Sequence, residues 1–532
     1  MTGAAAMDFD YIVCGAGSAG ATLAARLSEG GDRSVLLLEE GGMDTALAIH
    51  IPGLVGNLMF SKTLNWNYPG QPDPTLDQRG LTWMAGRVIG GGSSINGMVY
   101  GRGLPHDYAR WVEAGNPGWG WEEMLPWFRK MEHWHGAPHP ARGTDGPLQT
   151  RPYTAPHAAC TSAMQALVAA GVPFEPDYSV GIDEGVGYTQ ATQRGGWRHS
   201  TARAYLRPAL RRRNLTLHTR AFVTRLLIAE GHCVGVEYRR DGKLLEVRAR
   251  REVVVAMGAI GSPALLLRSG IGPADEMRAH GIAVHHDLPG VGRNLNEHVQ
   301  VKVSATVDVP TYNTERLGAG KVKNGLRWLV DRGGPAASPA NHCQAFVKTD
   351  PSLPSADVQI QVMAFAFHED PQVNDDGLTA VVSLCAPKVR GAVTLASADP
   401  FAPPKIDIAL LSDPDDVATL LKGCRIARAA LENGPVREFD GSIVYPAPET
   451  DSDDEWLAFI RRTAGINWHP TSTCRMGPGP DDVVDGELRV HGVAGLSVCD
   501  ASIFPCVTSA NTNVPVIAVA EKAASLILDR TA

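Results

Sequence analysis

The stretch DYIVCGAGSAGATLAARLSEGGDRSVLLLEEGG, from Asp10 to Gly42, changes its hydrophobic period twice. Residues 10–14 form a short β-rich run, residues 19–28 carry two leucines four positions apart, and residues 34–38 are apolar after Ser34. This order predicts a strand, a helix and a second strand, which is how a sheet covered by helices begins.

Glycines at the first strand-to-helix junction indicate a dinucleotide site. Gly15, Gly17 and Gly20 form G-x-G-x-x-G. The first glycine permits a tight turn, the second lets a pyrophosphate approach the backbone, and the third lets helix and strand pack closely. The helix N-terminus adds free N–H groups and a partial positive charge. Glu39 ends the second strand, where its carboxylate can bond an adenosine ribose and would repel the 2′-phosphate of NADP. The fingerprint alone does not distinguish FAD from NAD.

The composition limits the remaining possibilities. A chain of 532 residues, 44 % hydrophobic and 20 % charged, is typical of a globular protein with two or more domains. Its net charge of −8 argues against a nucleic-acid partner. Nine scattered cysteines without a C-x-x-C pair favour neither a disulfide framework nor a zinc ribbon. We see no secretory signal and no apolar run of about 18 residues. We therefore expect a soluble, cytoplasmic protein without a transmembrane segment.

The segment VVVAMGAIGSPALLLRSGIG, Val253 to Gly272, predicts a buried strand that turns into a helix. Ser262 suits the N-cap, Pro263 the first helical position and Gly270 the C-terminal stop. A strand–turn–helix unit of this kind, taken alone, is compatible with many α/β proteins.

Two other segments favour a buried ligand site. GRVIGGGSSINGMVYGRG, Gly86–Gly103, has glycines followed by serines, so its backbone can lie flat against a ligand and its hydroxyls can bond phosphate oxygens. VCDASIFP, Val498–Pro505, is a strand that ends in an acid, and a helix follows it. Asn513 can cap that helix, which has Pro515 in its first turn and runs to about Leu528.

The stretch NWHPTSTCRMG, Asn467–Gly477, places His469 five residues before Cys474. The two side chains could be metal ligands, a base with its nucleophile, or buried residues. No further pair stands at metal-ligand spacing, since His491 alone is insufficient, and no partner is evident that would orient a Cys–His pair. Cysteine is among the residue types most often buried, so a structural Cys474 is favoured and no metal site is predicted.

In their order along the chain, these motifs resemble the glucose–methanol–choline (GMC) family of FAD-dependent oxidoreductases. Residues 86–103 are similar to the first family signature and residues 258–272 to the second. NWNY at 65–68, GVGRNLNEH at 290–298 and the NTNVP helix also fall in family order, so the resemblance covers about residues 8–530. It implies FAD as the cofactor.

The resemblance also assigns residues to the FAD. Those expected to hold its pyrophosphate and adenosine are Gly15, Gly17, Ser18, Ala19, Glu39 and Val223. Those expected elsewhere along the cofactor, mostly at the flavin and ribityl, are Trp66, Arg87, Gly91, Gly92, Asn96, Gly97, Met98, Val99, Gly258, Trp468, Asp500, Ala501, Thr512 and Asn513. Ile95 stands where some choline oxidases carry a histidine attached to FAD, so a non-covalent flavin is expected.

Two residues match the catalytic pair of the family. Oxidation of an alcohol sends a hydride from the carbinol carbon to the flavin and a proton from the hydroxyl to a base, for which a neutral imidazole is suited. His469 matches the catalytic histidine, and Asn511 matches its partner position. Asparagine can hydrogen-bond the substrate oxygen but cannot take its proton, so His469 would be the only base. The helix beginning near Val514 would direct its positive end at the flavin.

The resemblance implies an α/β fold, α+β overall, with two domains. We expect a doubly wound, Rossmann-like FAD-binding domain from residues 8–150, 200–300 and 480–532. Residues 151–199 and 301–479 are expected to form a substrate domain built on an antiparallel sheet.

Among the subfamilies, the chain resembles bacterial choline dehydrogenase-like and L-sorbose dehydrogenase-like enzymes, and furanic and aryl alcohol oxidases. We expect oxidation of a small-molecule primary alcohol to an aldehyde, with electrons passed to an acceptor other than oxygen. The alternatives are an oxygen-using oxidase, a redox-silent lyase or photodecarboxylase of the same fold, and a non-catalytic flavin-binding protein. Phe365, Phe367 and Trp468 are candidates for the alcohol pocket, although such aromatics are more often core residues.

Overall fold

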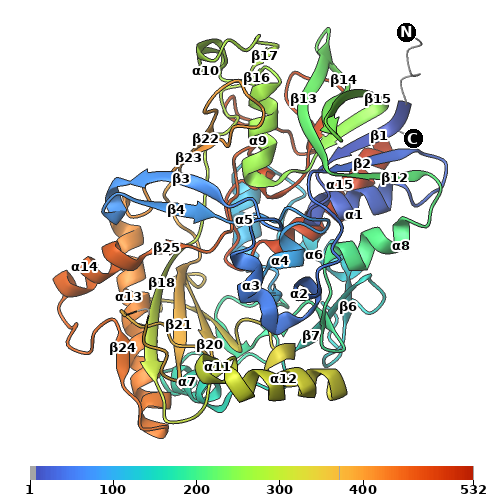
Figure 1. Cartoon of the computed structure of the whole chain (residues 1–532). Coiled ribbons are helices and arrows are strands. Elements are labelled where there is room, and N and C mark those ends of the chain that lie inside the picture. The colour runs from blue at the N-terminus through green and yellow to red at the C-terminus, as the bar shows by residue number, and fades with distance from the viewer. Residues whose placement is uncertain (1–7, 371, 531–532) are drawn as a thin grey trace.

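The computed structural model describes residues 8–370 and 372–530, and two seven-stranded sheets dominate it (Figure 1). The prediction that the N-terminus carries no secretory signal falls partly on the residues before Asp8, which lie outside this description. Within the described ranges, no helix combines the length and the apolar character that a membrane crossing requires.

The first sheet has the strand order β12–β2–β1–β15–β14–β13, with β26 beside β15. The pairs β12–β2, β2–β1, β1–β15 and β15–β26 are parallel, whereas β13, β14 and β15 form an antiparallel meander. The strands are β1 (Asp8–Cys14), β2 (Val35–Glu39), β12 (Leu215–Thr219), β13 (Ala221–Ala229), β14 (His232–Arg240), β15 (Lys243–Val255) and β26 (Leu496–Val498).

The opening strand–helix–strand unit matches its prediction. β1 is followed by α1 (Ser18–Leu27) and then by β2. Every residue of β2 is buried, as expected for a parallel strand with both faces of its sheet covered.

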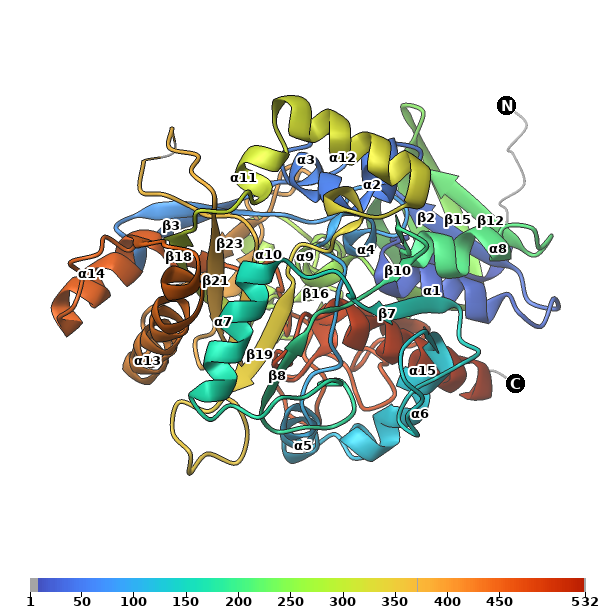
Figure 2. The same cartoon turned by 90° about the horizontal axis from the view of Figure 1, so that it is seen from below.

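The second sheet is antiparallel throughout, with the order β24–β18–β21–β20–β19–β8 and β25 beside β18. Its strands are β8 (Gly185–Tyr188), β18 (Val299–Thr306), β19 (Cys343–Val347), β20 (Val358–Met363), β21 (Gly377–Leu384), β24 (Ile443–Tyr445) and β25 (Gly465–Ile466). Its apolar face joins a core with α7 (Ala158–Ala169) and α13 (Pro414–Leu431), which run along it in Figure 2.

The opposite face of the second sheet is polar. Gln300 lies opposite Ser383 in the strand register, and Gln359 lies on the other side of Ser383. Gln361 follows two positions later on β20, so its side chain lies on the same face.

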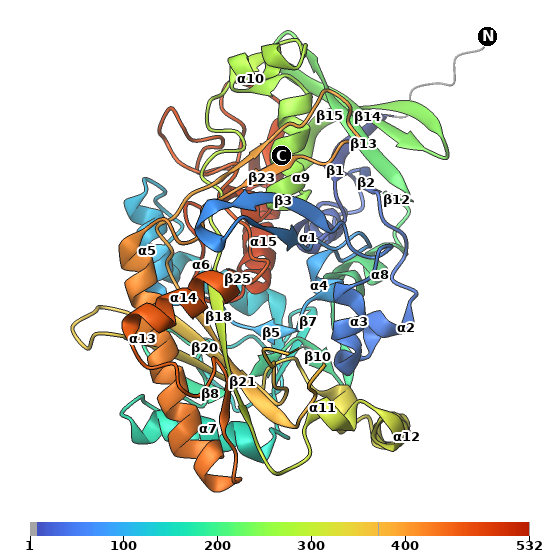
Figure 3. The same cartoon turned by 60° about the vertical axis from the view of Figure 1, so that its left-hand side comes forward.

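The other helices and strands lie around the two sheets (Figure 3). The longest helix at the C-terminal end, α15 (Asn513–Arg530), packs against α1 and α6. The remaining helices are α2 (Leu47–His50), α3 (Val55–Met59), α4 (Gly92–Ile95), α5 (Pro105–Glu113), α6 (Trp121–Met131), α8 (Arg207–Ala209), α9 (Gly258–Arg268), α10 (Ala274–Ala279), α11 (Tyr312–Glu315), α12 (Gly318–Asp331) and α14 (Asp453–Thr463). The remaining strands are β3 (Tyr68–Asp73), β4 (Arg79–Trp83), β5 (Val99–Tyr100), β6 (Glu132–Trp134), β7 (Leu148–Pro152), β9 (Gln190–Ala191), β10 (Gln193–Arg194), β11 (Trp197–Arg198), β16 (Ile271–Gly272), β17 (His286–Asp287), β22 (Ala392–Thr394) and β23 (Lys405–Asp407).

One helix start differs from its prediction. α9 begins at Gly258, so Ser262 and Pro263 lie inside it and not at its N-cap and first position. The Ser262 hydroxyl instead donates to Asp500 Oδ2 at 2.5 Å and accepts from the Met257 N–H. It therefore links the start of the helix to the C-terminal segment and does not cap the helix. Gly270 does follow the helix with φ of +77°, as a C-terminal stop should.

The fold class predicted from the sequence is confirmed by a largely parallel sheet with helices and a separate antiparallel sheet. The division of the chain into domain segments stays a prediction. Two large hydrophobic cores accompany the sheets; Leu76 and Trp83 from the early chain join the second core, and Cys474 and Met476 from the late chain join the first.

Candidate active site

The first glycine motif and the segment around Gly91 touch through their backbones. A Cβ at Gly91 would stand 2.7 Å from Gly17 Cα, and Gly91 has φ of +50°. The Gly90 N–H donates to Ala16 O at 2.7 Å. A Cβ at Gly20 would stand only 1.8 Å from Gly15 O, which explains the third glycine. The two motifs therefore form one side-chain-free cradle.

Two helix N-termini converge on this cradle. Asn513, the first residue of α15, donates from Nδ2 to the Oγ of Ser18, the first residue of α1, at 2.6 Å. In the described chain no side chain caps the start of α1. The positive ends of both helices therefore face the same place, which suits an anion such as a pyrophosphate. Asn513 was predicted as a cap, but its side chain bonds the neighbouring helix.

Glu39 is held at the end of β2 by backbone donors. Its carboxylate accepts the Ala16 N–H at 2.9 Å and the Gly41 N–H at 2.8 Å. Burial raises its pKa to about 7. Arg87 pairs with the adjacent Glu40 at 2.5 Å and lies 5.0 Å over the Trp66 ring. Both side chains therefore lie near Glu39, whereas the resemblance assigns Arg87 to the flavin. Trp66 also packs edge-on against Phe222, the neighbour of Val223.

Asp500 joins the second motif to the C-terminal segment. It is buried, and its Oδ2 accepts from the Gly258 N–H at 2.8 Å as well as from Ser262. Burial raises its pKa. This bond fixes Ala501, which follows Asp500, beside the start of α9.

The residues after the glycine triplet are also fixed by hydrogen bonds. Asn96 Oδ1 accepts from Arg198 at 2.7 Å and from the Met98 N–H at 3.1 Å. Met98 has φ of +62°. A Cβ at Gly97 would stand 2.9 Å from the Ala340 Cβ, so this turn is closely packed. The other predicted residues lie at the ends of nearby elements: Gly92 begins α4, Val99 begins β5, and Thr512 directly precedes α15.

His469 and Asn511 meet as predicted. Asn511 Nδ2 lies 3.1 Å from His469 Nε2, and Asn511 Oδ1 accepts from Gln361 Nε2 at 3.0 Å. Because the amide oxygen accepts from Gln361, the amide nitrogen donates to His469 Nε2. His469 Nε2 is therefore unprotonated and carries a lone pair.

Two residues that the sequence did not single out complete the site. His298 Nδ1 lies 2.9 Å from His469 Nδ1. Since His469 Nε2 is unprotonated, its Nδ1 carries the proton and donates a hydrogen bond to His298 Nδ1. Glu297 accepts the His469 backbone N–H at 2.8 and 2.9 Å. The hydrogen-bond chain runs from Gln361 through Asn511 and His469 to His298.

The pKa values of this cluster favour neutral imidazoles. Burial, together with the neighbouring His298, holds the pKa of His469 well below its ordinary value. Burial lowers the pKa of His298 to about 4 and raises the pKa of Glu297 to about 8. A neutral His469 with its lone pair on Nε2 is the form that a general base requires.

The remaining sequence candidates lie apart from the hydrogen-bond chain. Cys474 is buried in the first core, and burial raises its pKa far above the ordinary range, as expected for a structural thiol. The Trp468 indole donates to Thr82 O at 3.0 Å. Phe365 and Phe367 lie edge to face, with ring centroids 5.2 Å apart, and Lys302 lies 4.4 Å over Phe367.

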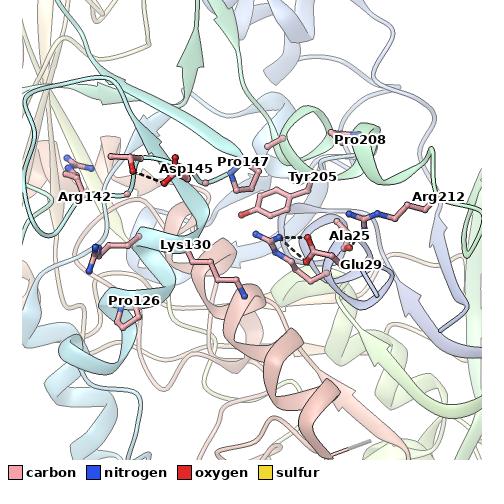
Figure 4. Close-up of a pocket in the computed structure, with 16 residues that line it drawn as sticks. Ala25, Glu29, Pro126, Lys130, Arg142, Asp145, Pro147, Tyr205, Pro208 and Arg212 are labelled. Atoms are coloured by element: carbon pink, nitrogen blue, oxygen red, sulfur yellow. Dashed lines mark hydrogen bonds and ion pairs between the residues drawn. The ribbon is translucent and has the colours of Figure 1, made fainter. Parts of the chain in front are cut away.

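A separate groove of about 740 Å³ lies at the other end of α1 (Figure 4). Its walls include Arg26, Lys130, Tyr205 and Arg212, and none of its lining residues belongs to the predicted site. Arg26 is paired at 2.8 Å with the buried Glu521.

A dinucleotide-like cofactor fits the residues present. The cradle at Gly17 and Gly91 lacks side chains, two helix N-termini face it, and Glu39 stands at one end. His469 is linked to Asn511, which lies two residues before the start of α15.

Comparison with known proteins agrees with this geometry. The GMC oxidoreductase family models match residues 9–300 and 387–520. The chain belongs to the GMC oxidoreductase family. It is an FAD-dependent oxidoreductase that acts on alcohols.

Individual relatives cover nearly the whole chain. An oxygen-dependent choline dehydrogenase of Rhizobium rhizogenes is 38 % identical, covering 98 % of this chain and 96 % of that protein. The corresponding protein of Photobacterium profundum is also 38 % identical, covering 98 % and 93 %. Among solved structures, pyridoxine 4-oxidase from "Mesorbium loti" has a TM-score of 0.87 at 29 % identity, covering 97 % of this chain and 98 % of that one. Aspergillus oryzae RIB40 formate oxidase, as its R554A variant, has a TM-score of 0.91 at 27 % identity, covering 99 % of both.

The sequence contained a signal for the missed residues in this GMC enzyme. Glu297 and His298 stand next to each other at the start of a buried strand, where charged side chains are rare unless they have partners. Their partner, the NWHP segment, lies about 170 residues later, so the contact itself was not visible in the sequence.

Proposed function

We propose that this enzyme oxidises a primary alcohol to an aldehyde, with His469 as the base and Asn511 as the group that bonds the substrate oxygen. The observation that carries the proposal is the hydrogen-bond chain in which Asn511 leaves a lone pair on His469 Nε2. FAD, when bound, supplies the acceptor for the hydride.

In this mechanism the alcohol hydroxyl replaces the direct hydrogen bond between Asn511 Nδ2 and His469 Nε2: its oxygen accepts from the amide and its hydrogen is donated to the imidazole. The His469 imidazole takes the hydroxyl proton, while the amide N–H stabilises the developing negative charge on that oxygen. His298 accepts from His469 Nδ1 and thereby keeps the proton off Nε2. Glu297 holds the His469 backbone and so fixes the position of the ring.

The cofactor contacts proposed for this site follow the cradle. Gly15, Gly17, Ser18 and Ala19 would hold the pyrophosphate, and Glu39 would bond the adenosine ribose. Trp66 and Arg87 would lie at the adenosine end with Glu39. Residues 91–99, with Asp500, Ala501, Thr512 and Asn513, would hold the ribityl and flavin parts. We propose that the flavin is non-covalent, because Ile95 offers no nucleophile. A cytoplasmic location is also part of the proposal.

We propose an electron acceptor other than oxygen, with an oxygen-using oxidase as the competing possibility. One screen of primary alcohols, followed both by peroxide formation and by reduction of an artificial acceptor, distinguishes them. Turnover with the artificial acceptor and without matching peroxide is expected. Peroxide formation at the same rate as alcohol consumption would establish the oxidase, and a flavin that no alcohol reduces would contradict both.

A further inference from the structure

Helix α12 presents an apolar surface to solvent. Five of the fifteen large hydrophobic side chains exposed in the described ranges stand on or directly before it: Leu317, Val322, Leu326, Leu329 and Val330. Val330 is 86 % exposed and Leu329 is 61 % exposed. Such clustering is unusual on a protein surface and marks an interaction site.

The orientation of α12 is opposite to that of an ordinary surface helix. Gly320, Asn324 and Trp328 form the stripe that faces the protein, where Trp328 Nε1 donates to Gly196 O at 3.0 Å. At about 100° per residue, Val322, Leu326, Leu329 and Val330 lie roughly diametrically opposite that stripe. The apolar residues therefore do not support the fold but point away from it.

Cations flank the apolar stripe on both sides. Lys321 lies at one edge, and Lys323 and Arg327 lie at the other. Asp331 is the single acid of the helix and lies 3.6 Å from Arg327. The helix is thus net positive on a chain whose net charge is −8.

Neighbouring segments carry two further exposed apolar side chains. α2 and α3 lie near α12 in Figure 2, and above it in Figures 1 and 3. A Cβ at Gly53, between these two helices, would stand 2.8 Å from Ala336, which follows α12. Phe60, directly after α3, is 80 % exposed, and Leu47 on α2 is also exposed.

We propose that this α12 surface docks on an anionic lipid bilayer, with α12 lying in the plane of the headgroups. An outward apolar stripe between basic flanks is the pattern of an interfacial helix. The basic charge of the helix complements anionic headgroups, whereas the acidic remainder of the chain would be repelled by them. The α12 surface adjoins Arg316, whose guanidinium lies 5.2 Å over Phe365, so docking holds a candidate pocket residue near the lipid.

Vesicle flotation of the FAD-loaded enzyme tests the proposal. The enzyme is expected to float with phosphatidylcholine vesicles that contain phosphatidylglycerol, to float poorly with phosphatidylcholine alone, and to be released as ionic strength rises. Lys321→Glu and Lys323→Glu are each expected to lower partitioning about fivefold or more. Leu329→Asp is expected to abolish it.

A matched control separates this surface from general stickiness. Leu244, on the β14–β15 hairpin, is 62 % exposed, so Leu244→Asp makes the same change at equal exposure and should float like the wild type. Equal loss in both variants, or no flotation of the wild type at low salt, overturns the proposal. If Leu329→Asp instead disrupts a dimer and leaves flotation unchanged, the surface binds a second copy and the lipid proposal is wrong. Flotation needs no turnover, so this test is independent of the proposed reaction.

Discussion

Replacing His298 by leucine is expected to slow flavin reduction by an alcohol without removing the flavin. The substitution leaves the His469 Nδ1–H, now 2.9 Å from His298 Nδ1, without its acceptor. An unpaired buried donor costs about 1–3 kcal/mol, and this cost slows the reaction because it is greatest in the transition state, where His469 gains positive charge. Since each 1.36 kcal/mol changes a rate tenfold, the expected loss is roughly fivefold to 150-fold.

A conservative variant makes the test specific. His298→Asn can place its Oδ1 where His298 Nδ1 stands, so it should recover much of the rate. Anaerobic stopped-flow absorbance gives the rate constant for flavin reduction at each pH. Equal rates in the wild type and the leucine variant, or no recovery by asparagine at normal FAD content, would refute the proposed role of His298.

Three further changes have expected outcomes. The pKa of Glu297 is raised by burial from 4.5 to about 8, so the free energy of unfolding should fall as pH rises between these values, and Glu297→Gln should flatten that slope in thermal melts; parallel slopes would contradict this. Gly91→Ala should purify with little FAD, since its Cβ would collide with the first glycine motif, whereas Gly42→Ala, whose Cβ meets nothing within 4 Å, should keep its FAD. Phe367 is a candidate pocket residue, and Lys302 already lies over the ring face that could attract a quaternary ammonium. Choline should therefore have a lower kcat/KM than a neutral primary alcohol, and Lys302→Met should bring the two kcat/KM values closer together. A higher kcat/KM for choline than for neutral primary alcohols in the wild type would contradict this expectation.

The parts of the fold that depend on local rules could be predicted from the sequence. The β1–α1–β2 unit followed from a change of hydrophobic period and three glycines, because each of those signals acts within a few residues. His469 and Asn511 were identified through motif order, and the structure brings them together.

The parts that depend on long-range contacts could not be predicted. Ser262 has the sequence signature of an N-cap, yet it bonds Asp500, which lies 238 residues later, and the helix begins earlier. His298 and Glu297 acquire their roles only when the start of β18 packs against residue 469. The spacing of apolar residues shows that α12 is amphipathic, but only the exposure of its side chains in the folded structure shows that the apolar side faces outward.

The most direct test of the central claim is the rate of flavin reduction in His469→Ala under anaerobic conditions with a primary alcohol that reduces the wild type. With FAD content and melting temperature unchanged, the account predicts a rate constant about 10² to 10⁴ lower than in the wild type, because the general base has been removed. Added imidazole should restore part of the rate. Reduction of the variant flavin at the wild-type rate would contradict the assignment of His469 as the base.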